Sequence, residues 1–567
     1  MLQKPIKSND FPIGISDFKE VIKEKCVLID KTLFVKDIME NKAKVILLTR
    51  PRRFGKTMNM SMLGHFLRMG GEDVFKGLKI KEHGEFCKEY QNKYPVIFLT
   101  FKDVKYDDFG MAYSDIKGIL ADLYGKNRDL LEGDLLDEPE RETFEDIRFG
   151  RLDDQVKLGH GLKKMTEFMH RKYGVPPILL LDEYDTPIVH AYLKQYYDPM
   201  ISFMRLLLGS ALKDNSDLGK AVLTGITKVS KESLFSGLNN LRVYTILDEK
   251  YGQYFGFTEE EVASILPENV PLEPIKRWYN GYKIGGFQVY NPWSIMYCLD
   301  NNHLLMPYWL DTSDNALVHE LIEKHKIHLG ERFEKLIKGI PESEQVLNSN
   351  LTFPNLDKKE DAIWTLLLHT GYLHVTSSYL NEDGQLMGTL GIPNKEVRGV
   401  YTELVELWFT STLGFSSEYY GKMIKTLLDG NVEKFTDHIR KYINGSISYF
   451  DLHENTPENV FHSFMLGLFM GLGLSHIVDS NKEAGKGRYD IIIIPKDKSK
   501  MGILIEFKVA KTPEDLGESA KDALAQIRAK NYTNAFIQHE IKTVLLIGMA
   551  FCGREVEAVH EMMDAHL

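Results

Sequence analysis

The chain has few cysteines, and their positions suit neither cross-linking nor metal binding. Among its 567 residues only Cys26, Cys87, Cys298 and Cys552 occur, and no two of them form a C-x-x-C pair. A disulfide framework and a cysteine-based zinc site are therefore not indicated. This usage is typical of a reducing compartment, and we expect a cytoplasmic protein.

The sequence also lacks long apolar segments, internal repeats and low-complexity tracts. The stretch Met1-Leu-Gln-Lys-Pro-Ile-Lys7 contains no apolar signal core. No segment has the length of uninterrupted apolar residues that spans a bilayer. We therefore expect neither secretion nor a membrane partner.

The length and net charge of the chain limit the number of domains and the kinds of partner that we expect. A chain of 567 residues with 43% hydrophobic and 27% charged residues is typical of a soluble protein with two or three domains. The formal net charge of −11 means that a nucleic-acid surface would be a local basic patch. Global charge thus neither supports nor excludes a nucleic-acid partner.

The most informative stretch is a basic turn, Arg50-Pro-Arg-Arg-Phe-Gly-Lys-Thr57. Residues 45–49 before it have the β-branched and aliphatic composition of a strand, and residues 58–67 after it that of a helix packed on a sheet. This context predicts a phosphate-binding P-loop, although the first glycine of G-x-x-x-x-G-K-[ST] falls on Arg50. The alternative is that Gly-Lys-Thr merely begins a helix.

In a P-loop the backbone N–H groups of Arg53, Phe54 and Gly55 would contribute to an anion-binding nest at the helix N-terminus. Lys56 would reach the β- and γ-phosphates of ATP, and Thr57 would place its hydroxyl on Mg²⁺.

A second strand pattern, Pro177-Ile-Leu-Leu-Leu-Asp-Glu-Tyr-Asp185, ends in acidic residues. A buried parallel strand delivers such carboxylates to the C-terminal edge of the sheet. Asp182 would hold the Mg²⁺ shell, and Glu183 would orient or deprotonate the attacking water. Alternatively, the strand only ends in a solvated acidic loop.

Two more strands are expected, over residues 95–101 and 220–227. The second contains Thr224 and Thr227, either of which could contact the γ-phosphate or the water. The alternation of strands and helices predicts a parallel three-layer α/β domain over residues 1–245. A helix beginning near Ser16, whose hydroxyl could cap it, is expected in the lead-in, which would pack beside the nucleotide base.

These motifs resemble the AAA-ATPase-like family of bacterial P-loop proteins, whose members also carry arginines where Walker loops usually carry the first glycine. The resemblance implies binding of ATP and Mg²⁺ at Lys56, Thr57 and Asp182. The stretches that carry it are Pro12-Ile-Gly14, Val27-Leu-Ile-Asp-Lys-Thr32, Arg50 to Thr57, Leu181-Asp-Glu-Tyr-Asp-Thr-Pro187, Leu223-Thr-Gly-Ile-Thr-Lys-Val-Ser230, Ser236-Gly-Leu-Asn-Asn240, Trp278-Tyr-Asn-Gly-Tyr282, Val289-Tyr-Asn-Pro-Trp-Ser294 and Tyr308-Trp-Leu-Asp-Thr-Ser313.

Residues 246–400 are rich in aromatic and turn residues, and we predict a helical or winged-helix-like middle domain. Its tryptophan and tyrosine clusters could stack on unpaired bases, but rigid packing corners are the favoured interpretation. Transition-state arginines are conceivable at Arg205, Arg242 and Arg277, and the sequence does not choose among them.

Residues 401–455 read as a helical connector, with one helix from Tyr401 to Leu413 and another from Tyr419 to Ile443. Residues 456–567 then change character. A helix from Glu458, three short strands, a helix from Pro513 to Lys530 and a strand from Thr543 give an αβββαβ order. This order predicts a mixed sheet with helices on its faces.

The hairpin within this domain places charged residues on strands. With a turn centred near Lys498, Asp490 lies opposite Glu506, and Lys508 shares the face of Glu506. Asp490 and Glu506, with the carbonyl of Phe507, could bind Mg²⁺, while Lys508 would steady a metal-activated water. The alternative is an ordinary edge salt bridge.

The spacing and element order resemble the PD-(D/E)XK nuclease superfamily, with a restriction-endonuclease-like fold. The resemblance implies that Glu458 and Gln526 complete the catalytic site. The sequence thus predicts an ATPase coupled to metal-dependent cleavage of nucleic acid, with DNA favoured over RNA and a homo-oligomer conceivable. The alternative is a nucleotide-switch signalling or scaffold protein whose nuclease-like domain binds nucleic acid without cutting it.

Overall fold

A computed structural model describes most of the chain, and the described part divides into two compact units. One consists of Met1–Lys324 with Ser343–Val397, the other of His325–Glu342 with Arg398–Leu567. The described residues are 10–228, 234–235, 239–309, 318, 332–333, 335–337, 339–347, 353–356, 360–401, 417–445, 465, 468–469, 472, 475–480, 483–484, 487–488, 490–530, 534–537 and 539–564.

The first unit is built on a five-stranded parallel sheet in the order β2-β3-β4-β1-β5. Its strands are β1 (Val45–Thr49), β2 (Val96–Thr100), β3 (Ile178–Asp182), β4 (Lys220–Gly225) and β5 (Leu241–Tyr244). Every residue of β1, β3 and β4 is buried, as expected for central strands covered on both faces. The four predicted strands are confirmed; β5 was not predicted.

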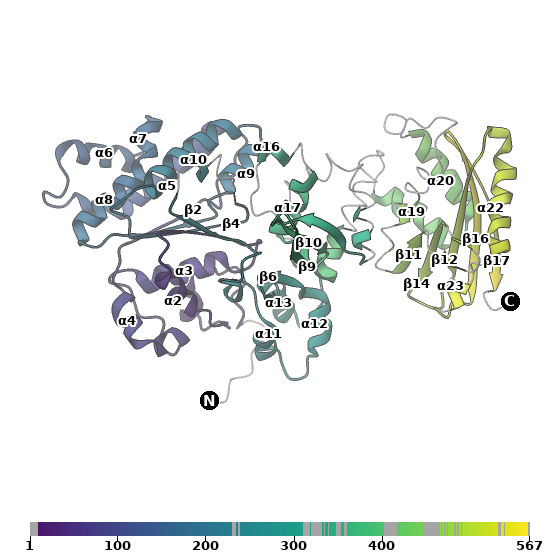
Figure 1. Ribbon diagram of the computed structural model, residues 1–567, viewed down its shortest axis with the longest axis horizontal. Coiled ribbons are helices and arrows are strands. Elements are labelled where there is room, and N and C mark those ends of the chain that lie inside the picture. Colours follow the sequence, from purple (N-terminus) through teal and green to yellow (C-terminus); the bar gives the residue numbers. More distant parts are fainter. Residues whose placement is uncertain are drawn as a thin grey trace. The chain divides into compact units, whose positions relative to one another are not determined.

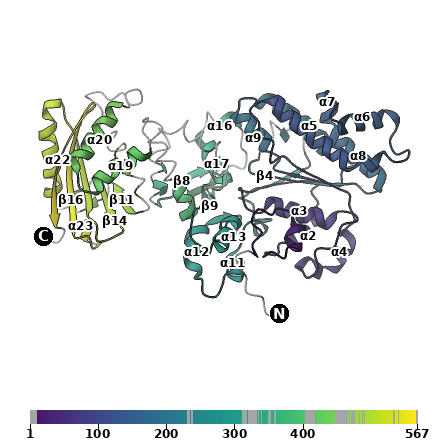
Figure 2. The same cartoon turned by 180° about the vertical axis from the view of Figure 1, so that it is seen from behind.

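Helices cover both faces of this sheet, which makes the predicted three layers. Helices α2, α3 and α4 lie on one face, and α5, α8 and α10 lie on the other (Figures 1 and 2). The helices are α1 (Phe18–Lys23), α2 (Leu33–Glu40), α3 (Lys56–Leu67), α4 (Gly84–Tyr90), α5 (Phe109–Lys126), α6 (Glu138–Arg148), α7 (Gln155–Gly159), α8 (Gly161–Tyr173), α9 (Thr186–Leu193) and α10 (Tyr197–Leu212).

The predicted cap of the first helix is wrong by one residue. Asp17, not Ser16, precedes α1, and its carboxylate accepts the N–H of Glu20. Asp17 also accepts a hydrogen bond from the hydroxyl of Ser61 at 3.0 Å and lies 2.8 Å from a ring nitrogen of His65. The carboxylate is used twice, to cap α1 and to tie the lead-in to α3.

The middle of the chain contributes helices and small sheets to the same unit, apart from Glu342 at the start of β8. The order of β8, β10 and β9 in their sheet is β8-β10-β9, and β6 pairs with β7. The elements are α11 (Glu259–Ile265), α12 (Leu272–Tyr279), β6 (Tyr282–Ile284), β7 (Phe287–Val289), α13 (Pro292–Asp300), β8 (Glu342–Val346), α16 (Phe353–Leu356), α17 (Glu360–Thr370), β9 (His374–Leu380) and β10 (Leu386–Gly391).

The aromatic residues of this part mostly pack inside it. Trp309 and Trp364 are among the largest fully buried side chains, and Tyr279, Tyr290 and Tyr308 belong to one hydrophobic cluster. Packing corners therefore account for these residues better than a base-stacking surface does.

The second unit contains a five-stranded mixed sheet in the order β11-β14-β15-β16-β17. Only β15 and β16 are parallel neighbours. The elements are α19 (Ser417–Leu428), α20 (Val432–Gly445), β11 (His476–Ser480), β12 (Glu483–Ala484), β13 (Gly487–Arg488), β14 (Ile491–Pro495), β15 (Gly502–Val509), α22 (Leu516–Lys530), α23 (Asn534–Ile537), β16 (Thr543–Cys552) and β17 (Glu555–Asp564).

Two features of this unit differ from the predicted elements. The single helix expected over residues 419–443 is wrong, because Gly430 adopts a left-handed φ of 79° and separates α19 from α20. The final strand, β17, was not predicted. The helix expected from Glu458 lies largely outside the described residues, and so does the one expected over residues 401–413.

Helix α22 packs directly on the sheet. A Cβ atom on Gly548 of β16 would lie 2.3 Å from the carbonyl oxygen of Ala520, so glycine is required for this close approach. Across the described part of the chain, we find no helix with the length and apolarity needed to cross a membrane.

A buried carboxylate ties the middle of the first unit together. Glu396 is fully buried, and its carboxylate accepts hydrogen bonds from the hydroxyl of Ser294 at 2.8 Å and from the N–H of Trp309 at 2.8 Å. Burial raises the pKa of Glu396 to about 7. The folded protein therefore holds a proton here that the unfolded chain releases near pH 4.5.

Because only the folded protein keeps this proton, we expect the free energy of unfolding to depend on pH. As the pH rises from about 4.5 to about 7, only the unfolded chain ionises Glu396, so the free energy of unfolding should fall by about 3 kcal/mol. Glu396→Gln keeps the hydrogen-bond acceptor and should lack this decline. Urea unfolding at several pH values, followed by tryptophan fluorescence, measures the difference.

The exposed Glu382→Gln is the control, and its stability should follow that of the wild type at every pH. Parallel pH profiles for wild type and Glu396→Gln would contradict the prediction.

Candidate functional site

The turn after β1 wraps around the amino group of Lys56. Gly55 adopts a left-handed φ of 80° and leads into α3, which begins at Lys56. The Lys56 ammonium donates to the carbonyls of Arg50 at 3.1 Å and Pro51 at 2.9 Å. Burial is the largest influence on Lys56 and lowers its pKa, opposed by Glu183 and Asp182. A buried ammonium at a helix N-terminus is suited to binding phosphate.

Asp182, at the end of β3, connects the turn to the neighbouring strands. The hydroxyl of Thr57 donates to Asp182 Oδ2 at 2.6 Å, and the hydroxyl of Thr224 donates to Asp182 Oδ1. Because β4 lies between β1 and β3, Thr224 can reach the same carboxylate as Thr57. Burial raises the pKa of Asp182, and the two hydroxyls oppose this. The structure thus brings Thr57, Asp182 and Thr224 together.

The two threonines proposed for the end of β4 have different partners. Asp185 is buried and accepts from the N–H of Ile226 at 3.0 Å and from both the N–H and the hydroxyl of Thr227 at 2.8 Å. Thr227 therefore anchors the loop after β4, while Thr224 lies at the carboxylate nearest the P-loop. Glu183, between the two aspartates, has a left-handed φ of 51°.

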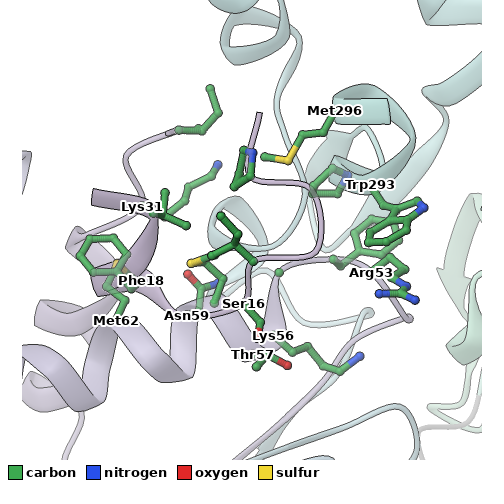
Figure 3. Close-up of a pocket in the computed structure, with 18 of the residues that line it drawn as sticks. Ser16, Phe18, Lys31, Arg53, Lys56, Thr57, Asn59, Met62, Trp293 and Met296 are labelled. Carbon is green, nitrogen blue, oxygen red and sulfur yellow. The ribbon is translucent and has the colours of Figure 1, made fainter. Parts of the chain in front are cut away.

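A cavity of about 450 Å³ opens beside the turn (Figure 3). Glu183 lines it, together with residues of the P-loop and of the lead-in segment, including Pro12 and Ile15. Its basic lining residues are Lys31, Arg52, Arg53, Lys56, Lys102 and Lys105; the acidic ones are Asp103 and Glu183. The cavity is thus suited to a polyanionic ligand with an apolar end.

Sequence reasoning missed Lys102 and Lys105. They follow β2, whose C-terminal end lies at the same edge of the sheet as those of β1 and β3. The available signal was a pair of lysines just after a predicted parallel strand. Trp293 and Met296, from α13, also line the cavity. Trp293 lies in a stretch that carries the family resemblance but was not predicted to line the site, and Met296 had no signal in the sequence.

Residues from the middle of the chain pack against the P-loop on several sides. The ring centroids of Phe54 and Tyr282 lie 4.9 Å apart, and a Cβ atom on Gly371 would lie 3.1 Å from Pro51. The guanidinium of Arg53 lies 3.9 Å from the ring centroid of Trp293. The loop is therefore held by parts of the chain more than 200 residues away.

Arg50, at the position of the missing glycine, is fully buried. Its guanidinium donates to the carbonyl of Tyr244 at 3.0 Å and lies 4.9 Å from the ring centroid of Phe255. Burial lowers the pKa of Arg50 to about 9. Since Arg50 has no positive φ, the loop entry does not require glycine.

None of the three arginines considered from the sequence lines this cavity. Arg277 pairs with Glu273 on α12, and Arg242 lies over the ring of Tyr244. Arg205 is exposed on α10. The arginines that line the cavity are Arg52 and Arg53 of the P-loop itself.

The second unit has its own acidic cluster, and the hairpin register is the predicted one. Ile491 pairs with Ile505, which places Asp490 opposite Glu506. Asp490 Oδ2 accepts the N–H of Phe507 at 2.7 Å, so the backbone group of Phe507 that meets this carboxylate is its N–H. Gln526, on α22, donates its side-chain amide to Glu506 Oε1.

Glu506 carries a buried oxygen that lacks a partner. Its side chain is 2% exposed, and Oε2 has no hydrogen bond. Burial and the neighbouring Asp490 raise the pKa of Glu506 to about 8, while Lys508 and Lys530 oppose this. Two carboxylates that converge in this way repel each other unless a cation or a proton joins them.

The donor set fits a Mg²⁺ ion that keeps part of its water shell. Magnesium prefers oxygen ligands and is commonly bound through one or two carboxylates. Asp490 and the orphaned oxygen of Glu506 supply such ligands. Among the described residues no group of three or more metal-binding side chains occurs, and Glu458 lies outside them.

The two sites define two classes of domain. The parallel sheet with the turn at Lys56 after β1 is that of a P-loop ATPase, and the mixed sheet of the second unit is nuclease-like. Residues 12–235 match the family described as predicted AAA-ATPase, and residues 456–561 match the PD-(D/E)XK nuclease superfamily. The chain thus carries an AAA-ATPase-like domain followed by a domain of that nuclease superfamily.

Two similar proteins extend the comparison. An uncharacterized protein from the vnfD 5′ region of Azotobacter chroococcum mcd 1 is 26% identical over 554 residues, which cover 95% of this chain and 96% of the relative. The Walker-type ATPase PABY2304 of Pyrococcus abyssi is 14% identical in sequence, and the match covers 71% of this chain and 99% of the Pyrococcus chain. The TM-score of 0.31 is too low for this likeness to support an argument.

The orphaned oxygen of Glu506 predicts a divalent-ion site in the second unit. Asp490→Asn and Glu506→Gln each remove a carboxylate ligand of the ion and should weaken Mn²⁺ binding about tenfold or more. Electron paramagnetic resonance of Mn²⁺ titrated into the nucleotide-free protein measures free and bound ion.

Asp497→Asn, in the exposed turn of the same hairpin, is the matched control and should bind Mn²⁺ like the wild type. Equal Mn²⁺ affinity in all four proteins would exclude the site.

Proposed function

We propose that the protein binds and hydrolyses ATP and couples this to metal-dependent cleavage of phosphodiester bonds in nucleic acid. The observation that carries the proposal is that one chain contains two carboxylate sites suited to a divalent ion. One is Asp182 on the hydroxyl of Thr57, beside Lys56. The other is the orphaned oxygen of Glu506 beside Asp490.

In the first site the chain would use residues already in contact. Lys56, now on the loop carbonyls, would exchange them for β- and γ-phosphate oxygens. Thr57 and Asp182 would hold Mg²⁺, which neutralises the charge that develops during phosphoryl transfer. Thr224 would keep Asp182 oriented, and Glu183 would orient or deprotonate the attacking water.

Backbone N–H groups of Arg53, Phe54 and Gly55 would bind phosphate oxygens. The lead-in residues that line the cavity would pack against the base of the nucleotide.

In the second site Asp490 and Glu506 would hold a Mg²⁺ ion that lowers the pKa of a bound water. Gln526, through its hydrogen bond to Glu506, would leave the other carboxylate oxygen directed to the ion. Lys508 would steady the attacking water, and Glu458 would complete the site. DNA is the preferred substrate over RNA, and assembly of several copies is part of the proposal.

A second candidate is a nucleotide switch whose nuclease-like domain binds nucleic acid without cutting it. This candidate is favoured by the absence, among the described residues, of any group of three or more metal-binding side chains at Asp490 and Glu506. Cleavage assays with divalent ions separate the two candidates.

The ATPase proposal predicts that Lys56→Ala abolishes ATP hydrolysis, because the γ-phosphate loses its main cationic partner. Phosphate release at saturating ATP and Mg²⁺ measures this. Lys88→Ala, an exposed lysine on α4, should retain the wild-type rate. Undiminished turnover by Lys56→Ala would remove the P-loop assignment.

The nuclease proposal predicts Mg²⁺- or Mn²⁺-dependent cutting of single- or double-stranded DNA by the full chain. Glu506→Ala and Lys508→Ala should each lower the rate by about 100-fold or more, since they remove a metal ligand and the cation beside the attacking water. Asp497→Asn is again the control. Binding without cutting in the wild type would favour the switch instead.

A further inference from the structure

Arg53 has an unusual position at the cavity. It belongs to the P-loop, its side chain is exposed at the cavity, and its guanidinium lies 3.9 Å from the centroid of the Trp293 ring (Figure 3). Trp293 comes from α13, whose first turn is capped by Asn291 through the N–H groups of Trp293 and Ser294. The ring is thus fixed to a helix end and presents its face to the arginine.

The backbone at Arg53 is strained. Its φ is 67°, a left-handed conformation that glycine adopts without cost and that a residue with a side chain adopts at a cost of about 1 kcal/mol or more. Such strain is maintained only where the surrounding structure enforces it, and it clusters at functional sites. The side chain of Arg53 is therefore a candidate for a function that glycine could not perform.

Stacking and phosphate binding use different parts of a guanidinium. The aromatic ring contacts its flat face, whereas phosphate oxygens bind to the N–H groups at its edge, so both interactions can be made at once. Contact with Trp293 restricts the guanidinium of Arg53 and so lowers the conformational entropy lost when phosphate binds.

Arg53 lines the cavity together with Lys56 and Glu183, the two residues proposed to act on the terminal phosphate and the attacking water. Burial lowers the pKa of Arg53; the carboxylate of Glu183, which would orient the attacking water, opposes this, and Arg52 adds to it. Lys56 responds to the same pair of charged residues, Glu183 and Arg52. Because all three residues line one cavity, a terminal phosphate held there by Lys56 would have Arg53 among its cationic neighbours.

We propose that Arg53 is a catalytic arginine supplied by the P-loop itself, which binds the terminal phosphate of ATP, and that Trp293 is its positioning residue. This rests on the proposed ATPase function. No arginine from another chain is then needed at this position.

The step balances without a further reactant. A water oxygen bonds to the γ-phosphorus as the bond from that phosphorus to the β,γ-bridging oxygen breaks, and the electron pair leaves with ADP. The proton of the water passes to Glu183 and then to solvent. Arg53 forms no covalent bond and binds the negative charge on the γ-phosphate oxygens.

Arg53→Gly tests the arginine, because glycine accepts the left-handed φ and preserves the loop. In the full chain it should lower kcat for ATP by about 100-fold or more, the scale of losing one preorganised donor. Trp293→Leu should lower kcat about tenfold with KM changed less than about twofold, and Trp293→Phe, which keeps a ring face, should restore most of it.

The matched control is Trp278→Leu, since Trp278 also carries a stacked cation, Lys395 at 4.4 Å, away from the cavity. Its kcat should equal that of the wild type. A second readout is tryptophan emission during titration with a slowly hydrolysed ATP analogue and with ADP. The triphosphate should change the emission more than ADP does, and Arg53→Gly or Trp293→Phe should remove that difference.

The outcomes separate the two proposals. Wild-type turnover that Lys56→Ala abolishes but Arg53→Gly leaves intact overturns the role of Arg53 alone. Turnover that Trp293→Leu and Trp278→Leu lower equally overturns the positioning role of Trp293. No ATP turnover and no emission response in the folded wild type overturns the proposed ATPase function, and the role of Arg53 with it.

Discussion

The hydrogen bond from Thr57 to Asp182 is the interaction on which the first unit depends. It joins the helix after β1 to the end of β3, and Thr224 from the intervening strand holds the second oxygen of the same carboxylate. Asp182 is fully buried, so without these donors its charge would be costly to maintain. The strand order that places β4 between β1 and β3 is what allows both donors to reach it.

The P-loop is part of a larger packed structure. Arg50, Phe54 and Arg53 each contact an aromatic residue from the middle of the chain, and Arg50 does so from the position of the first glycine of a usual Walker loop. The conformation of the loop is therefore held by contacts with residues that are distant in sequence. A change in the loop on nucleotide binding would therefore alter contacts of β6 and α13, which gives the middle segment a physical means of responding to ATP.

The second unit also contains a buried carboxylate, that of Glu506, but one of its oxygens has no hydrogen-bond partner. The hairpin register brings Glu506 and Asp490 together. Burial and Asp490 raise the pKa of Glu506, and the positive charges of Lys508 and Lys530 offset this rise only in part. An unsatisfied carboxylate oxygen in an otherwise well-packed sheet is a cost to stability. Costs of this kind are typical of sites that a ligand completes.

Local pattern in the sequence determined β1, β3, the turn at Lys56 and Thr57 and the register of Asp490 against Glu506, because strand period and turn spacing are short-range properties. Only the tertiary structure decided that Thr224 meets Asp182 while Thr227 meets Asp185, that β5 and β17 join their sheets, and that Trp293 meets Arg53. These contacts join residues tens to hundreds of positions apart, and their partners depend on strand order and packing, which local composition does not specify.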